Sequence, residues 1–282
     1  MSYITVSDAD YGFLDPASLA EKGRDLAERY RSNAPFPHIV IDDFITPALL
    51  DACLAAFPSA PDPDSASFDR AQERYKTSYN PDHLPARARS FFYSLNSRPF
   101  IQFLENMTGI KGLLPDPYFL GGGFHETKEG GHLSVHADFN IHPILKLERR
   151  LNLLLYLNKD WRIDYGGALE LWDPAMQAKV QEIAPDYNRC VVFSTTATSY
   201  HGHPVPVAHP DKAPRRSLAL YYYTARIDET ARAYTTQFRR RPASEDAVDW
   251  RVKGDEIVND LLPPILNRTV RRLARRLKRS VS

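Results

Sequence analysis

The chain has 282 residues, a formal net charge of +1, and a composition of 43% hydrophobic and 25% charged residues. These values are typical of a soluble globular protein with a large core, and they exclude nucleic-acid binding that rests on overall basic charge. Cys53 and Cys190 lie far apart and form no CxxC motif, which is typical of a reduced protein. The first residues predict no signal peptide, and no apolar run is long enough for a spanning helix. We therefore expect a cytoplasmic protein.

The first 113 residues mix helical and strand patterns. Three segments have apolar residues near helical spacing and are expected to be helices: residues 16–31, residues 46–57 and residues 86–108. Thr46 is the expected N-cap of the second segment, and the third is expected to break near Pro99. The β-branched run within residues 35–45 predicts a strand. Residues 58–85 are loop-like or polar and predict no regular element.

From residue 114 onward, the pattern changes to the strand period. Six short runs rich in leucine, valine and aromatic residues are separated by Gly, Pro, Asn and Asp: residues 117–126, 132–139, 150–158, 167–173, 189–195 and 215–224. Many short strands late in a chain predict a sandwich or a jelly roll. We expect an α+β chain with bracing elements at residues 1–113, a β-core at 114–228 and a helical tail at 229–282, together making one compact domain.

The last residues of the chain, 265–282, predict a basic amphipathic helix. Leucine and valine form one stripe, and arginine and lysine cover the remainder. Such a face suits an acidic partner or an anionic membrane surface, and a nucleic acid is not the expected partner. The simpler interpretation is a terminal helix docked on its own domain with its basic face in solvent.

The sequence HLSVHAD places His136 and Asp138 two residues apart. Alternate side chains of a strand share a face, so the imidazole and the carboxylate would point the same way. A third ligand from a distant strand would complete the 2-His-1-carboxylate set that holds non-haem Fe(II). His201 is the candidate for that third ligand, and His203 is the alternative.

Further features downstream agree with a metal site inside a β-barrel. Residues 150–161 form an apolar strand that carries Tyr156, and the glycine pair at 166–167 predicts a tight turn. Arg215 opens a later strand whose parity separates it from Arg216. An arginine that points into an apolar barrel needs an anion, and the carboxylate of a ligand can supply one.

The order HxD, YLNKDW, GG, distal SxH and RxSL resembles the Fe(II)/2-oxoglutarate-dependent oxygenases of the prolyl-4-hydroxylase type. YLNKDW followed by GG is especially similar to the animal oxygen-sensing prolyl hydroxylases and their bacterial relatives. The resemblance covers residues 114–225, and residues 35–45 are similar to the N-terminal part of many bacterial members. It implies a double-stranded β-helix, which is a jelly roll and agrees with the strand pattern.

Carried over position by position, the resemblance implies that His136, Asp138 and His201 bind iron and form the catalytic centre. Arg215 would pair with the distal carboxylate of 2-oxoglutarate, and Tyr156 would donate a hydrogen bond to the same carboxylate. We call His136, Asp138 and His201 the ligand triad.

Other residues near these motifs are harder to assign. His201 is preferred over His203 because it keeps the SxH spacing. Many members carry a tyrosine before the HxD strand, and His125 lies nearest to that position; it is either a ligand contact or an ordinary loop histidine. His132 and His142 are expected to lie outside the ligand set.

The implied activity is hydroxylation of an unactivated C–H bond in an amino acid, a peptidyl group or another small metabolite. 2-Oxoglutarate and O2 would be consumed, succinate and CO2 would be released, and ascorbate is a candidate reductant. Two alternatives stay open: a zinc hydrolase or lyase that uses the same triad, and a non-catalytic jelly-roll module that acts through the basic C-terminal helix. The sequence carries no readable code for the substrate.

Overall fold

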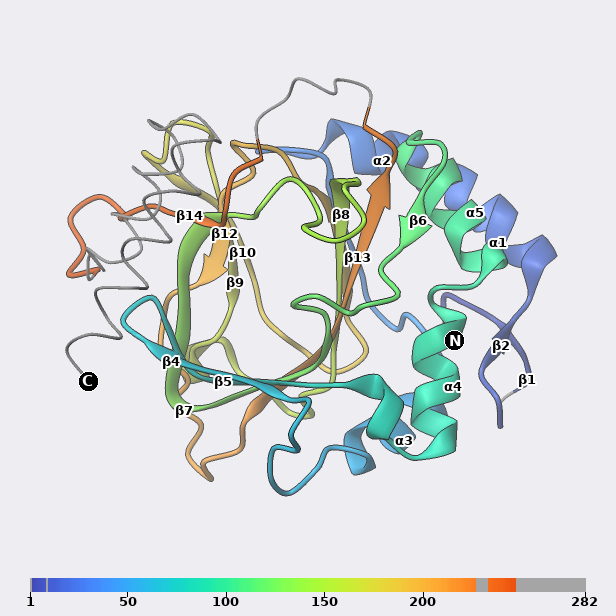
Figure 1. Cartoon of the computed structure of the whole chain (residues 1–282), viewed down its shortest axis with the longest axis horizontal. Coiled ribbons are helices and arrows are strands. Elements are labelled where there is room, and N and C mark those ends of the chain that lie inside the picture. The colour runs from blue at the N-terminus through green and yellow to red at the C-terminus, as the bar shows by residue number, and fades with distance from the viewer. Residues whose placement is uncertain (1, 9, 227–232, 247–282) are drawn as a thin grey trace, which may run out of the picture.

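The computed structural model describes residues 2–8, 10–226 and 233–246, and one large antiparallel sheet curls around its interior (Figure 1). The main path of this sheet runs in the order β10-β9-β12-β7-β13-β8-β11-β3. Strands β5 and β14 pair with β7, strand β4 pairs with β5, and strand β6 pairs with β13. The path places β7, which carries the HxD motif, between β12 and β13.

The elements have the following bounds. The strands are β1 (Val6–Asp8), β2 (Phe13–Leu14), β3 (His38–Ile41), β4 (Ala66–Arg70), β5 (Glu73–Tyr79), β6 (Leu114–Pro115), β7 (Gly123–Ala137), β8 (Glu148–Tyr156), β9 (Leu169–Trp172), β10 (Lys179–Ile183), β11 (Cys190–Ser194), β12 (His201–His203), β13 (Arg215–Thr224) and β14 (Gln237–Phe238). The helices are α1 (Pro16–Asp25), α2 (Ala27–Ser32), α3 (Pro47–Ala55), α4 (Ala86–Ser94) and α5 (Arg98–Thr108), with 3-10 turns η1 (Pro81–His83) and η2 (Ile163–Tyr165).

The predicted helices form, with changes at their ends. Residues 16–31 form α1 and α2, which meet at Leu26, whose backbone stays in the right-handed helical region with φ −85° and ψ −10°. Thr46 occupies the N-cap position of α3 as expected, although its side chain makes no capping hydrogen bond. The break in residues 86–108 falls between α4 and α5, with Pro99 in the first turn of α5, where its missing N–H has no intrahelical partner to lose.

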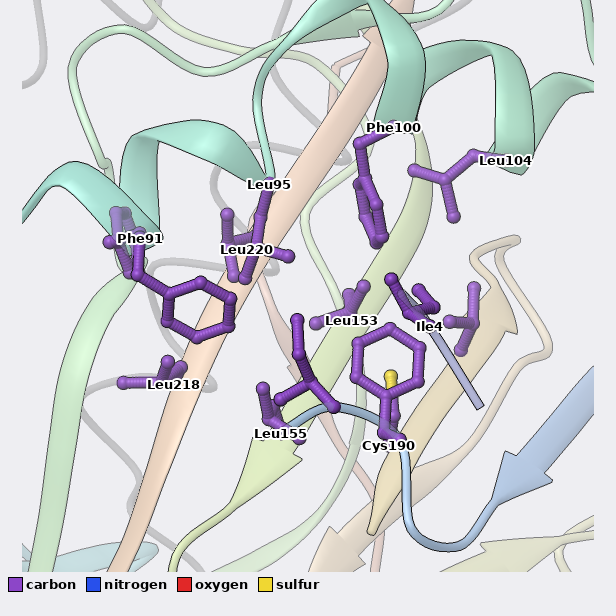
Figure 2. Packing of buried hydrophobic residues seen from close by; sticks show 14 of the residues in the cluster. Ile4, Phe91, Leu95, Phe100, Leu104, Leu153, Leu155, Cys190, Leu218 and Leu220 are labelled. Atoms are coloured by element: carbon purple, nitrogen blue, oxygen red, sulfur yellow. The ribbon is translucent and has the colours of Figure 1, made fainter. Parts of the chain in front are cut away.

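The outer face of the sheet packs against the helices. In Figure 2, the leucines of β8 and β13 point toward the aromatic and leucine side chains of α4 and α5. Alternate residues of a strand face opposite sides, so each strand supplies every second residue to this core. The six apolar residues expected to be buried in residues 86–108 are fully buried: Phe91, Phe92, Leu95, Phe100, Phe103 and Leu104.

The inner face of the same strands forms a smaller core around a cavity. Tyr156 of β8 and Phe193 of β11 pack there with apolar residues of β9. Two of the neighbours on this inner face are polar instead of apolar, Asn152 of β8 and Ser217 of β13, and both are buried. Polar side chains buried inside an otherwise apolar barrel point to a binding site.

Two regions differ from the prediction. Residues 66–79, expected as loop and mixed polar sequence, form the β4–β5 hairpin, which pairs with β7. The two runs at 117–126 and 132–139 belong mostly to one long strand, β7. None of the helices in the described residues is long and apolar enough to cross a membrane. The predicted basic helix at 265–282 lies outside the described residues, and the proposed domain limits at 113/114 and 228/229 stay predictions.

Candidate active site

The ligand triad meets at one end of the curled sheet. His136 lies near the end of β7, and Asp138 follows directly after that strand. Strand β12 runs antiparallel beside β7, and its register places His201 opposite His136. Gly202 permits this close pairing, because a Cβ at that position would lie 2.8 Å from the carbonyl oxygen of Leu133. Residues far apart in sequence are therefore brought together by strand pairing.

The three side chains converge on one point. Nε2 of His136 lies 3.5 Å from Oδ1 of Asp138, and Nε2 of His201 lies 3.5 Å from Oδ2 of the same carboxylate. One donor atom from each residue lies within 4.8 Å of the other two. The two imidazoles are only 4% and 6% exposed, so solvent does not separate the donors.

Backbone hydrogen bonds fix the orientation of both imidazoles. Nδ1 of His136 donates to the carbonyl oxygen of Ser134, and Nδ1 of His201 donates to that of Ser199, each over 2.9 Å. A neutral ring that donates through Nδ1 carries its lone pair on Nε2. Burial lowers the pKa of His201 to about 4, although Asp138 opposes that shift. Nε2 of both rings therefore faces the Asp138 carboxylate, so that a cation placed between them would be contacted by all three residues.

Arg149 and Asn152 hold the carboxylate of the triad. The Nδ2 amide of Asn152 donates to Oδ2 of Asp138 over 2.7 Å, and Nη2 of Arg149 lies 3.2 Å from the same oxygen. Arg149 also donates from Nε and Nη2 to Oδ1 of Asn152. Burial alone would raise the pKa of Asp138, but Arg149 and the triad histidines hold it well below its usual range. The carboxylate is thus kept ionised and fixed in position.

Arg215 lies deeper in the cavity and is 4% exposed. Its Nε donates to the carbonyl oxygen of Gly167 over 2.6 Å, and its Nη2 donates to the Tyr156 hydroxyl over 3.3 Å. Among the described residues, no carboxylate forms an ion pair with it. A buried guanidinium without a counter-ion is unfavourable unless a ligand supplies the anion.

The cavity joins the triad to Arg215. It measures about 200 Å³, and its wall includes the triad, Arg215 and Arg149 together with apolar side chains of the inner core. Tyr156 is fully buried behind Arg215 and is not part of that wall. Its contact with Arg215 orients the guanidinium, while its predicted contact with a cosubstrate stays a prediction.

The four other histidines near the sequence motifs divide into two pairs, one that lines the cavity and one that does not. His125 and His203 line the cavity, His125 donating to the carbonyl oxygen of Gly121 over 2.9 Å. Burial, followed by the charge of Arg215, holds the pKa of His203 well below its usual range. His132 and His142 do not line the cavity; Nε2 of His142 lies 3.2 Å from Oδ1 of Asp116.

Strand parity assigned the arginine pair of β13 correctly and missed Arg149. Arg216 faces away from the cavity and pairs with Glu126 over 2.8 Å. Arg149 escaped prediction because the pairing of β8 with β13 is irregular, so that Tyr223 pairs with Arg149 while Tyr222 pairs with Leu151. A bulge of this kind shifts the alternation that sequence parity assumes.

Comparisons with known proteins agree with this geometry. Residues 122–223 match the sequence model of the 2OG-Fe(II) oxygenase superfamily. No curated protein sequence matches the chain. Among solved structures, a prolyl hydroxylase from Trichoplax adhaerens, in complex with a peptide fragment of the hypoxia inducible factor oxygen degradation domain, is 18% identical with a TM-score of 0.51; the match covers 73% of this chain and 91% of that one.

Two further structures share the fold. A prolyl-4-hydroxylase from Pseudomonas putida is 15% identical with a TM-score of 0.50, over 74% of this chain and 99% of that one. HygX from Streptomyces hygroscopicus, with nickel and 2-oxoglutarate bound, is 11% identical with a TM-score of 0.50, over 81% and 98%. These likenesses confirm the expected double-stranded β-helix. Residues 122–223 thus carry the sequence of a 2OG-Fe(II) oxygenase, and the chain has the fold of the prolyl 4-hydroxylases; together with the ligand triad, this match gives Fe(II) and 2-oxoglutarate as the cofactors.

Proposed function

We propose that His136, Asp138 and His201 hold the Fe(II), that Arg215 binds the distal carboxylate of 2-oxoglutarate, and that the enzyme hydroxylates an unactivated C–H bond of an amino acid, peptidyl or other small-metabolite substrate. Succinate and CO2 would be the products of the cosubstrate. The convergence of two imidazole lone pairs on one ionised carboxylate, within 4.8 Å, carries this proposal.

The donor set fits Fe(II). Two neutral imidazoles and one carboxylate are the ligands of the facial triad, which leaves positions open for other ligands. When bound, Fe(II) and 2-oxoglutarate supply the oxidising chemistry, in which decarboxylation of the 2-oxoacid is coupled to hydroxylation. Arg149 and Asn152 engage Oδ2 of Asp138, so that Oδ1 is the oxygen left for the metal.

The protein residues supply binding, orientation and exclusion of water. The guanidinium of Arg215 offers its remaining N–H donors to a carboxylate, and Gly167 and Tyr156 fix its direction. Because Arg215 and the triad line the same cavity, a diacid held by Arg215 at its distal end would turn its 2-oxoacid end toward the metal ligands. Phe193 and Leu154 in the cavity wall keep water away from that end.

The outer part of the cavity is the proposed substrate side. The β4–β5 hairpin contributes Phe68, Arg70 and Lys76, and Phe238 of β14 closes the wall beside β7. Glu73 is shared by Arg70 and Lys76, with separations of 2.8 and 3.0 Å. One carboxylate between two cations leaves positive charge at this rim, which favours a substrate with an acidic group.

Conversion of 2-oxoglutarate to succinate tests the proposal. Purified protein with Fe(II) and ascorbate should release succinate and CO2, and a screen over amino acids, peptides and nucleotide sugars should find substrates that increase the rate. Asp138→Ala should abolish the release, whereas Asp211→Ala, an exposed loop carboxylate, should leave it unchanged. Full turnover by Asp138→Ala would contradict the triad. The zinc alternative predicts activity with Zn(II) and no use of 2-oxoglutarate, and it leaves Arg215 unexplained.

A further inference from the structure

His203 is a buried cavity residue to which the proposed function gives no role. It lies two residues after His201 on the short strand β12, so both imidazoles are on the same side of that strand. His203 is 4% exposed and lines the same cavity as Arg215. It is not part of the group of donors that lie within 4.8 Å of one another, so it is no fourth ligand of the triad.

The imidazole of His203 has no hydrogen-bond partner among the described residues. Its Nδ1 is buried and unpaired, unlike Nδ1 of His201, which donates to a backbone carbonyl. An N–H at Nδ1 would be buried without an acceptor, so the ring proton is better placed on Nε2. Because Nδ1 is covered by protein atoms while the ring lines the cavity, the edge that reaches the cavity carries Nε2.

The surroundings of this ring favour an anion. Strands β5, β7 and β13 lie side by side, and their register aligns Lys76, Thr127 and Arg215 in one row across the sheet. Residues directly opposite in antiparallel strands share a face, so both cations of the row lie on the cavity side. Glu73 already accepts from Lys76 over 3.0 Å. Neither Arg215 nor His203 has a carboxylate partner among the described residues.

We propose that Nε2 of His203 donates a second hydrogen bond to the distal carboxylate of 2-oxoglutarate, beside the contact from Arg215. Strand β7 lies between β12 and β13, so the two donors would reach one carboxylate from the two strands that flank it. The inference rests on the proposed function, because it takes the anion in this part of the cavity to be the cosubstrate.

The test compares His203→Asn with His203→Gln, whose side-chain amides differ in length by one methylene group. The amide nitrogen of Gln lies as many bonds from Cβ as Nε2 of His, while that of Asn matches Nδ1. The dissociation constant of 2-oxoglutarate is measured by calorimetry on full-length protein loaded with Ni(II), so that no turnover occurs. His203→Asn should weaken binding about tenfold or more, as expected when a charged acceptor loses a hydrogen bond, and His203→Gln should stay within about threefold of wild type.

A matched ligand assigns the effect to the distal carboxylate. 2-Oxopentanoate has the same chain length with a methyl group at that end, and its dissociation constant is read by displacement of 2-oxoglutarate. His203→Asn should weaken the binding of 2-oxoglutarate without weakening the binding of 2-oxopentanoate. Equal losses for both ligands, or a Gln variant as weak as the Asn variant, would overturn the inference.

A measurement on the wild-type chain removes the dependence on folding of the variants. In protein labelled with 15N-histidine and loaded with Zn(II), 2-oxoglutarate should slow the exchange of an Nε2 proton of His203, and 2-oxopentanoate should not. An Nε2 without a proton in the bound state would contradict the donor role. Wild-type protein that binds Ni(II) but no 2-oxoglutarate would instead refute the proposed function itself, so the two failures are distinguishable.

Discussion

Arg149 and Arg215 are both buried in the wall of one cavity, and they differ in what surrounds them. Arg149 lies 3.2 Å from the carboxylate of Asp138 and its guanidinium is 3.6 Å from the centre of the Tyr221 ring. Among the described residues, the guanidinium of Arg215 donates to a carbonyl oxygen and a tyrosine hydroxyl and forms no ion pair. The first arginine is neutralised within the protein, whereas the second has no carboxylate partner among the described residues, which supports its proposed role in binding an anion. Burial alone therefore does not separate a structural charge from a binding charge; the presence of a counter-ion does.

Among the substitutions that test this difference between the two arginines, Arg149→Met has the largest expected effect. It leaves the buried carboxylate of Asp138 without its cation, and we expect the free energy of unfolding of the metal-free protein to fall by about 3–5 kcal/mol. Chemical unfolding measures this, and added Fe(II) under anaerobic conditions should restore part of the loss. Arg162→Met removes the exposed partner of Asp164 and should leave the same quantity almost unchanged. A loss as small as that control would show that Arg149 is not needed to stabilise Asp138.

Arg215→Met should have the opposite pattern of effects, with little change in stability and a large loss of 2-oxoglutarate affinity. The free energy of unfolding should change by about 1 kcal/mol or less, because no carboxylate loses a partner. The affinity of the metal-loaded protein for 2-oxoglutarate should fall about 100-fold, since a charge-assisted pair is lost. Arg216→Met, on the opposite face of β13, should leave that affinity unchanged while Glu126 loses its partner. Equal affinities for the two variants would contradict the role of Arg215.

The direction of the Arg215 side chain depends on Gly167. A Cβ there would lie 2.8 Å from Cδ of Arg215, and the residue has a φ of +69°. We expect Gly167→Ala to weaken 2-oxoglutarate binding about tenfold and to lower stability by roughly 1 kcal/mol. Gly112→Ala is the matched control, because its φ is +72° and nothing lies within 4 Å of the added Cβ. It should cost similar stability without any loss of 2-oxoglutarate binding.

The smallest expected effect concerns the shared carboxylate of the hairpin. Burial raises the pKa of Glu73, but Lys76 and Arg70 together hold it below its usual value of 4.5. A carboxyl group with a depressed pKa stabilises the fold above its unfolded pKa, and that contribution is lost as the pH falls through the folded value. Glu73→Gln should therefore flatten the loss of stability below about pH 4.3, measured by thermal unfolding. A steep acid-side loss equal to that of wild type would contradict this.

The sequence alone predicted the parts of the fold that follow from alternation. The period-2 runs at 150–158 and 215–224 correspond to β8 and β13, and parity separated Arg215 from Arg216. The β4–β5 hairpin could not be predicted in this way, because its polar residues show no alternation of apolar and polar character. Its strand conformation comes from pairing with β7, a tertiary interaction that leaves no local pattern.

In the candidate site too, sequence patterns predicted some residues, whereas long-range strand pairing determined others. The HxD spacing and the distal histidine were readable as motifs, and the structure brings them together through the register of β12 with β7. That register is set by long-range pairing and is not encoded in spacing. Arg149 was missed because a bulge in β8 shifts its side chain to the cavity, and His203 was considered only as a competing ligand. The alternation of side chains along a regular strand cannot predict residues that lie where the strand pairing is irregular.

A crystal structure with Mn(II) and 2-oxoglutarate bound is the most direct test of the central claim. Anomalous scattering locates the ion, and the density of the diacid locates its two ends. The account predicts one ion held by Nε2 of His136, Nε2 of His201 and an oxygen of Asp138, with the distal carboxylate on Arg215. An ion bound elsewhere, or a diacid whose far carboxylate does not contact Arg215, would contradict it.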